Sequence, residues 1–239
     1  MSPTDSMESR LAHVRQRIAG ACAKAGRSPA EVTLLPVSKT FGIEEIRQAM
    51  ALGLNRFGEN KTQEIGQKAP QFSDSALSWV MIGHLQTNKA KEAARLVDEV
   101  QSLDRLPLAR ALEQRLQIEG RAIDVLVQIK TSTEPSKFGL EPTELPGFLK
   151  ELAVFECLRV KGLMTLAINS PDEAAVRACF SNLRLWRDRM QAEGAESLTR
   201  LSMGMSGDFE WAIAEGSTEI RVGSAIFGQR NYAVPGAAA

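Results

Sequence analysis

Short apolar runs alternate with amphipathic segments along the chain, and this alternation restricts the fold more than any other feature. Eight runs have the length and composition of strands: 32–39, 54–59, 79–84, 99–103, 123–131, 159–166, 199–203 and 219–223. Apolar residues at helical spacing fill the stretches between them. Strands that alternate with helices predict a parallel sheet, either a closed barrel or an open doubly wound sheet. The count of eight favours a single (β/α)8 TIM barrel, an α/β fold.

An additional helix is expected before the first run, because Leu11, Val14, Ile18 and Cys22 recur at helical spacing. A chain of 239 residues suits one large barrel. We therefore expect a single domain over residues 1–239. The segments 1–8 and 233–239 are expected to be frayed, as chain ends commonly are.

Composition excludes several classes of protein. The 29 basic and 29 acidic residues balance, which is not the footprint of a nucleic-acid or polybasic membrane partner. Three cysteines without a metal-binding spacing predict reduced thiols and no metal site. The chain starts without the pattern of a signal peptide and lacks a membrane-spanning apolar stretch. We expect a cytoplasmic protein.

Lys39 ends the first apolar run, where a barrel carries its active-site residues. If the run is a strand, Thr33, Leu35, Val37 and Lys39 lie on one face. Burial disfavours the cationic form of a lysine, and an uncharged amine is what Schiff-base chemistry requires. The alternative is a lysine that extends past the strand end into solvent.

Two stretches rich in glycine and serine follow the last two runs. The first contains Ser202, Gly204, Ser206 and Gly207, and the second contains Gly223 and Ser224. Hydroxyls and backbone N–H groups at helix starts bind phosphate, and barrels commonly place a phosphate site in these two loops. Either stretch alone could be a tight turn that needs small residues. Their joint occurrence favours a phosphate.

Arg221 lies in the last run, on the same face as Glu219 and Gly223 by alternation. The simplest interpretation is an exposed arginine or an ion pair with a glutamate. Beside a phosphate site, however, an inward arginine could donate to a ring nitrogen of the ligand. Arginine keeps its proton, so a pyridine nitrogen bonded to it would stay unprotonated.

Five motifs together resemble the pyridoxal-phosphate homeostasis protein family, over about residues 11–232. They are PVSKT (36–40), FGEN (57–60), IGHLQTNK (82–89), LSMGMS (201–206) and IRVGSAIFG (220–228). The resemblance implies the barrel of the alanine-racemase N-terminal domain, called fold type III among proteins that bind pyridoxal 5'-phosphate (PLP). It also implies that PLP is held as a lysine Schiff base, and that the protein serves PLP homeostasis and delivery, affecting amino-acid and keto-acid balance.

The resemblance assigns site residues by matching motif positions. Lys39 matches the Schiff-base lysine, Arg221 the residue near the pyridine nitrogen, Asn60 a pocket asparagine, and Ser202, Ser206, Gly223 and Ser224 the phosphate region. His84 belongs to a family motif, but it could equally be a capping or structural group. Lys137 follows the run 123–131 on the same rim. It is either an ordinary solvated loop lysine or a second lysine that takes the PLP aldehyde and helps to hand it on.

The alternative function is a PLP-dependent amino-acid racemase, which needs two acid/base groups flanking its substrate. In the racemases that this barrel resembles, a tyrosine from a C-terminal β-domain of the partner subunit supplies the second group. The single tyrosine of this chain, Tyr232, lies beyond the last motif, and we expect no room for such a domain. A non-catalytic carrier is therefore favoured. We expect a monomer whose partners are PLP and, transiently, apo-enzymes that use PLP.

Overall fold

The computed structural model describes residues 6–73, 76–132, 134 and 137–229. Eight parallel strands form one sheet in the order β1-β8-β7-β6-β5-β4-β3-β2. They are β1 (Thr33–Pro36), β2 (Arg56–Glu59), β3 (Ser78–Met81), β4 (Glu99–Leu103), β5 (Ile123–Gln128), β6 (Leu158–Met164), β7 (Arg200–Ser202) and β8 (Glu219–Val222). Neighbours in the sheet follow chain order, so no strand order reverses as it does in a doubly wound fold.

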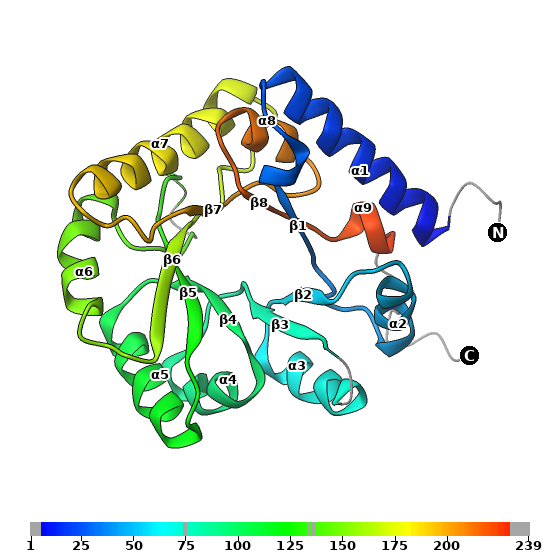
Figure 1. The fold of residues 1–239 in the computed structure, drawn as a ribbon. Coiled ribbons are helices and arrows are strands. Elements are labelled where there is room, and N and C mark those ends of the chain that lie inside the picture. The colour runs from blue at the N-terminus through cyan, green and yellow to red at the C-terminus, as the bar shows by residue number, and fades with distance from the viewer. Residues whose placement is uncertain (1–5, 74–75, 133, 135–136, 230–239) are drawn as a thin grey trace, which may run out of the picture.

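The sheet curves into a nearly closed barrel (Figure 1). β1 and β8, the first and last strands, pair in parallel. On its other side β1 approaches β2 through a parallel bridge between Val37 and Gly58. Ser38 N donates to Gly58 O at 3.1 Å beside that bridge. The prediction of a (β/α)8 barrel is therefore confirmed.

Helices surround the barrel (Figure 1). They are α1 (Met7–Lys24), α2 (Ile43–Ala51), α3 (Thr62–Lys68), α4 (Ala90–Leu96), α5 (Leu106–Glu119), α6 (Leu145–Leu152), α7 (Glu173–Ala192), α8 (Phe209–Ala214) and α9 (Ser224–Phe227). The expected extra helix is α1, whose stripe Leu11, Val14 and Ile18 is buried. Arg17 on α1 forms an ion pair with Glu210 on α8 at 2.8 Å, so the extra helix is joined to the last part of the barrel.

Helical structure begins nearer to the N-terminus than we expected. Ser6 Oγ accepts the Ser9 N–H at 3.1 Å, which caps α1 at its first turn. Met7, the first residue of α1, is buried. The expected fraying of residues 1–8 is therefore wrong for Met7 and Glu8. Residues 1–5 and 230–239, which include Tyr232, lie outside the described residues.

The strand predicted over 32–39 is shorter than expected. β1 ends at Pro36, and Lys39 lies in the turn that follows. Phe41 N donates to Ser38 O at 3.0 Å and closes this turn. The apolar run continues past the last backbone pairing, which is why the sequence overestimated the strand.

Cys22 and Cys179 are buried and Cys157 is half-buried, and all three are free thiols, as expected. Within the described residues, no helix combines the length and the apolar character needed to cross a bilayer.

Candidate ligand site at the barrel mouth

A pocket of about 510 Å³ opens at the carboxyl ends of the strands. Seven of the eight site residues expected from the sequence line it: Lys39, Asn60, His84, Ser206, Arg221, Gly223 and Ser224. Arg221 lies on β8, and the other six lie just beyond the ends of β1, β2, β3, β7 and β8. We call this pocket the mouth pocket.

Lys39 is half-buried in the turn after β1, where its backbone is fixed on both sides. Thr40 has a φ of 68° and is the one residue other than glycine with a positive φ among those described. Such a conformation is uncommon for a branched residue and needs support from its surroundings. Glu64 Oε2 supplies it by accepting the Thr40 N–H at 2.8 Å. The same contact holds the end of the turn that presents Lys39.

A buried ion pair supports the other side of this turn. Glu59 Oε1 accepts from Ser38 Oγ at 2.6 Å and from Lys68 Nζ at 2.7 Å. Lys68 Nζ also donates to Ser38 O at 3.1 Å. Burial raises the pKa of Glu59, and the charge of Lys68 opposes that rise. Sequence reasoning missed this pair, because nothing in the pattern shows that Lys68 on α3 turns inward to Glu59 and the Ser38 carbonyl.

Arg221 is buried in the wall of the mouth pocket, where two hydrogen bonds orient its guanidinium. Nη1 donates to Ser202 Oγ at 2.7 Å and Nη2 donates to Thr165 O at 2.8 Å. Burial lowers the pKa of Arg221 to about 10, which still leaves it protonated at neutral pH. The exposed arginine that the sequence allowed is therefore excluded.

Ser202 does not have the position we expected. Its side chain is fully buried and does not line the pocket. Its hydroxyl accepts from Arg221 and donates to Gln101 Oε1 at 2.7 Å. The assignment of Ser202 to the phosphate region is wrong in this respect, because β7 directs its hydroxyl into the barrel interior, where it holds Arg221.

The chain of hydrogen bonds continues below Ser202 to an ionic network in the barrel interior. Gln101 Nε2 donates to Glu99 at 2.7 Å and also to Glu219. Arg56 and Arg200 form ion pairs with both carboxylates. Glu219 is thus paired with these arginines. Arg221 is anchored through Ser202 and Gln101 to a buried network that fixes its orientation.

His84 lies against an aromatic ring on the opposite side of the pocket. Its imidazole stacks on Phe138, with ring centroids 3.8 Å apart and planes 18° apart. Burial lowers the pKa of His84, although the charge of Asp104 at 3.7 Å opposes this. His84 Nδ1 is buried and makes no hydrogen bond to any described residue. The stacked rings of His84 and Phe138 both line the mouth pocket and form part of its wall.

Two glycines allow the loops of the mouth pocket to approach each other. A Cβ on Gly83 would lie 2.3 Å from Asn60 O, so any side chain there would separate the loops after β2 and β3. Gly204 has a φ of 96°, and its Cβ would lie 2.6 Å from Ala212 Cβ. Gly83 thus lets the loops that carry Asn60 and His84 approach each other, and Gly204 lets the loop that carries Ser206 pack against α8.

The structure adds pocket residues that the sequence did not single out. Gln128 and Phe138 line the pocket, and Gln128 Nε2 donates to Phe138 O at 2.9 Å. Lys137, which the sequence did single out, lines the pocket as well, and its Nζ lies 3.7 Å from Glu134 Oε2. Gln128 ends a buried strand at the rim, which was an available signal for its place in the site.

Comparisons with known proteins identify the family. Residues 9–231 match the family model described as "Alanine racemase, N-terminal domain". A Pseudomonas aeruginosa protein named "Pyridoxal phosphate homeostasis protein" is 39% identical over 225 residues, covering 94% of this chain and 96% of its own length. The Escherichia coli K12 protein of the same name is 41% identical over 231 residues, covering 93% and 96%.

The chain belongs to the pyridoxal phosphate homeostasis protein family. Among solved members, PipY of Synechococcus elongatus PCC7942 with PLP bound superposes with a TM-score of 0.83 at 34% identity, covering 93% of this chain and all of PipY. An alanine racemase of Clostridium difficile 630 gives a TM-score of 0.76 at 14% identity, over 94% of this chain and 57% of the racemase. At that identity the likeness to the racemase concerns the fold alone.

Proposed function

We propose that this protein binds PLP, holds it as a Schiff base on Lys39, and serves intracellular PLP homeostasis and delivery. Through that role it would affect amino-acid and keto-acid balance. The observation that carries the proposal is that Lys39, Arg221, Ser206 and Ser224 line one pocket. The names of the relatives and the PLP bound to PipY support the same ligand.

The donor groups of the mouth pocket fit PLP. Bound PLP would supply an aldehyde with which the Lys39 amine could condense, with release of water. Ser206, Gly223 and Ser224 would offer hydroxyl and backbone donors to its phosphate. Arg221, whose guanidinium is oriented by its bond to Ser202, would donate to the pyridine nitrogen. His84 and Asn60 complete the opposite wall.

We further propose a carrier rather than an enzyme. Arg221 stays protonated at neutral pH, so it can donate to a ring nitrogen but cannot accept a proton from it. A ring nitrogen held in this way withdraws electrons less strongly, which disfavours removal of an α-proton. The racemase alternative keeps support from the shared barrel fold. Exchange of the α-proton of single amino acids in deuterated water, at rates typical of an enzyme, would decide for the racemase.

We also propose a monomer, because Lys39, Arg221 and Ser224 lie in one pocket of the same chain. We propose one domain over residues 1–239, a cytoplasmic location and apo-enzymes as transient partners. Sedimentation of the PLP-loaded protein tests whether it is a monomer. An obligate dimer with pocket residues supplied across its interface would contradict it.

Borohydride reduction followed by peptide mapping tests the Schiff base. Wild-type protein loaded with PLP should carry the reduced adduct on Lys39, and Lys39→Ala should lose the visible imine band. Lys61→Ala is a matched control, because Lys61 lies near the site but does not line the mouth pocket. Labelling of a different lysine in fresh wild-type protein would refute the assignment.

A further inference from the structure

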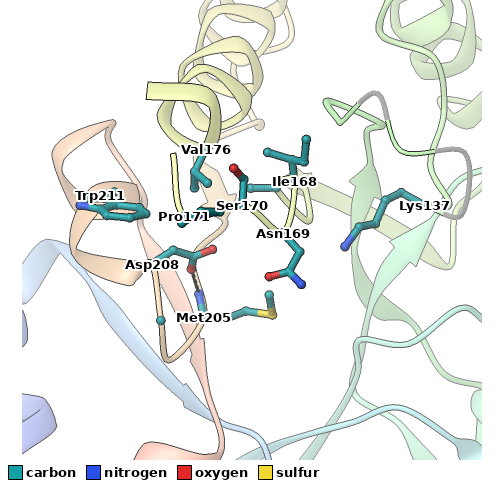
Figure 2. A pocket seen from close by; sticks show the side chains of 11 residues that line it. Lys137, Ile168, Asn169, Ser170, Pro171, Val176, Met205, Asp208 and Trp211 are labelled. Atoms are coloured by element: carbon teal, nitrogen blue, oxygen red, sulfur yellow. Dashed lines mark hydrogen bonds between the residues drawn. The ribbon is translucent and has the colours of Figure 1, made fainter. Parts of the chain in front are cut away.

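A second cavity of about 580 Å³ lies beside the mouth pocket (Figure 2). The two share Lys137, Met205 and Gly207 as a common wall. The second cavity extends toward α7 and α8, which contribute Val176 and Trp211. The proposed binding of PLP makes no use of this space, so we call it the side cavity.

The side cavity has groups of opposite charge on opposite sides. Figure 2 shows Lys137 extending its ammonium toward the Asn169 amide on one side, with Asp208 and Trp211 on the other. A simple anion would satisfy Lys137 and be repelled by Asp208. An apolar ligand would displace water from both charged groups without offering either of them a new partner, which is costly in a recess. A ligand that carries an anion and a cation at separate ends matches both.

Lys137 can offer donors to a bound anion. Its ammonium lies 3.7 Å from Glu134 Oε2, which is longer than a hydrogen bond. Glu134 Oε2 also accepts the Asn169 N–H at 3.2 Å. An ammonium has three donors, so this ion pair does not exhaust them. The Asn169 side chain adds an amide donor beside Lys137.

Asp208 provides a carboxyl group for the cationic end of the ligand. Its Oδ1 accepts the Met205 N–H at 2.6 Å, which fixes the carboxyl at the start of α8. Burial raises the pKa of Asp208, while that hydrogen bond and the charges of Arg221 and Lys137 oppose the rise. A carboxylate in such a desolvated position gains from a nearby cation. The Trp211 ring beside it is a further surface that cations favour.

We propose that the side cavity binds amino acids that have a terminal cation on an aliphatic side chain, the class of L-lysine. The α-carboxylate would contact Lys137 and Asn169, the chain would lie along the wall that includes Val176, and the terminal ammonium would lie between Asp208 and Trp211. Because Lys137 and Asp208 lie on different sides of the cavity (Figure 2), a ligand that contacts both must carry its two charges at separate ends. This site needs no Schiff base, so it stands apart from the proposed function.

Calorimetric titration of purified Lys39→Ala protein without PLP tests the proposal, because no imine on Lys39 can then form. L-Lysine and 6-aminohexanoate, which keep both end charges, should bind. L-Norleucine, which lacks the terminal ammonium, and 1,5-diaminopentane, which lacks the carboxylate, should each bind about tenfold more weakly or worse, since a hydrogen bond to a charged group contributes at least that factor.

Two variants made in this background locate the ligand. Lys137→Met should weaken L-lysine about tenfold and leave 1,5-diaminopentane unaffected. Asp208→Asn, which keeps an acceptor for Met205, should weaken L-lysine and 1,5-diaminopentane but not L-norleucine. Lys130→Met is the matched control, because Lys130 pairs with Glu141 and lies outside the cavity.

Equal affinities for all four compounds would overturn the proposal, and so would L-lysine binding that neither cavity variant changes. Binding seen with PLP-loaded wild type but absent from Lys39→Ala would also overturn it, since the amino acid would then act only at the imine. PLP retention by the wild type, followed by its visible absorbance, reports the proposed function separately.

Discussion

Replacing Lys68 by methionine should destabilise the protein and loosen the turn that presents Lys39. Methionine has a similar volume but cannot donate to Glu59 or to Ser38 O, the two close partners of Lys68. Glu59 is fully buried, and its Oε2 makes no hydrogen bond within the described chain. Removing one partner of such a buried pair costs about 3–5 kcal/mol, because the remaining charge stays desolvated.

The loss of folding stability caused by Lys68→Met should depend on pH. Burial raises the pKa of Glu59 above its unfolded value of about 4.3, and removal of the Lys68 charge raises it further. A carboxyl with a raised folded pKa favours the folded state while it is protonated. That contribution is present below the unfolded pKa and is lost as pH rises through the folded pKa. Lys68→Met should therefore differ little from wild type near pH 4 and most at pH 7 to 8.

Urea unfolding at a series of pH values measures the effect. Adding Glu59→Gln to Lys68→Met should recover much of the loss at pH 7, because a neutral amide needs no cation. Lys89→Met removes an ion pair with Glu92 at a more exposed position and should cost under about 1 kcal/mol. If Lys68→Met costs no more than this control at pH 7, or if its cost is the same at every pH, the reasoning fails.

Three further outcomes are expected. Ser202→Ala should release Arg221, weaken PLP retention by about 1.5–3 kcal/mol and shift the visible absorbance, as measured by spectral titration. The double variant Ser206→Ala/Ser224→Ala should weaken PLP binding without lowering the melting temperature, and unchanged affinity would argue against a phosphate site there. Lys137→Ala should leave initial PLP binding intact and slow transfer to an apo-enzyme in single-turnover experiments. Equal rates would leave Lys137 an ordinary loop lysine.

The strand pattern predicted the architecture because each strand of a parallel barrel is buried on both faces and reads as an apolar run. The run 99–103 matches β4 at both ends. The run 32–39 starts one residue before β1 and ends three residues after it, since composition does not reveal where backbone pairing stops. Closure itself rests on contacts between distant segments, such as the bridge between Val37 and Gly58, and only the count of eight strands suggested it.

The site was predictable as far as it depends on strand ends. Lys39, Arg221 and Ser224 meet in one pocket because parallel strands bring their carboxyl ends to one rim. The role of Ser202 was not predictable, because it depends on Gln101, a partner 101 residues away across the barrel interior. The sequence motif placed Ser202 at the correct strand end but could not show which way its hydroxyl points.

The contacts around the mouth pocket divide into two kinds, and this division suits a carrier. Arg221 is held by a chain of buried hydrogen bonds that ends in the ionic network of Glu99 and Glu219, so its orientation is set by the barrel itself. Lys137 stands on a rim loop, with an ion pair to Glu134 of 3.7 Å. In the proposed carrier, Arg221 would hold the ring while the less constrained Lys137 takes part in release at the rim. Such an exchange would leave the buried network undisturbed.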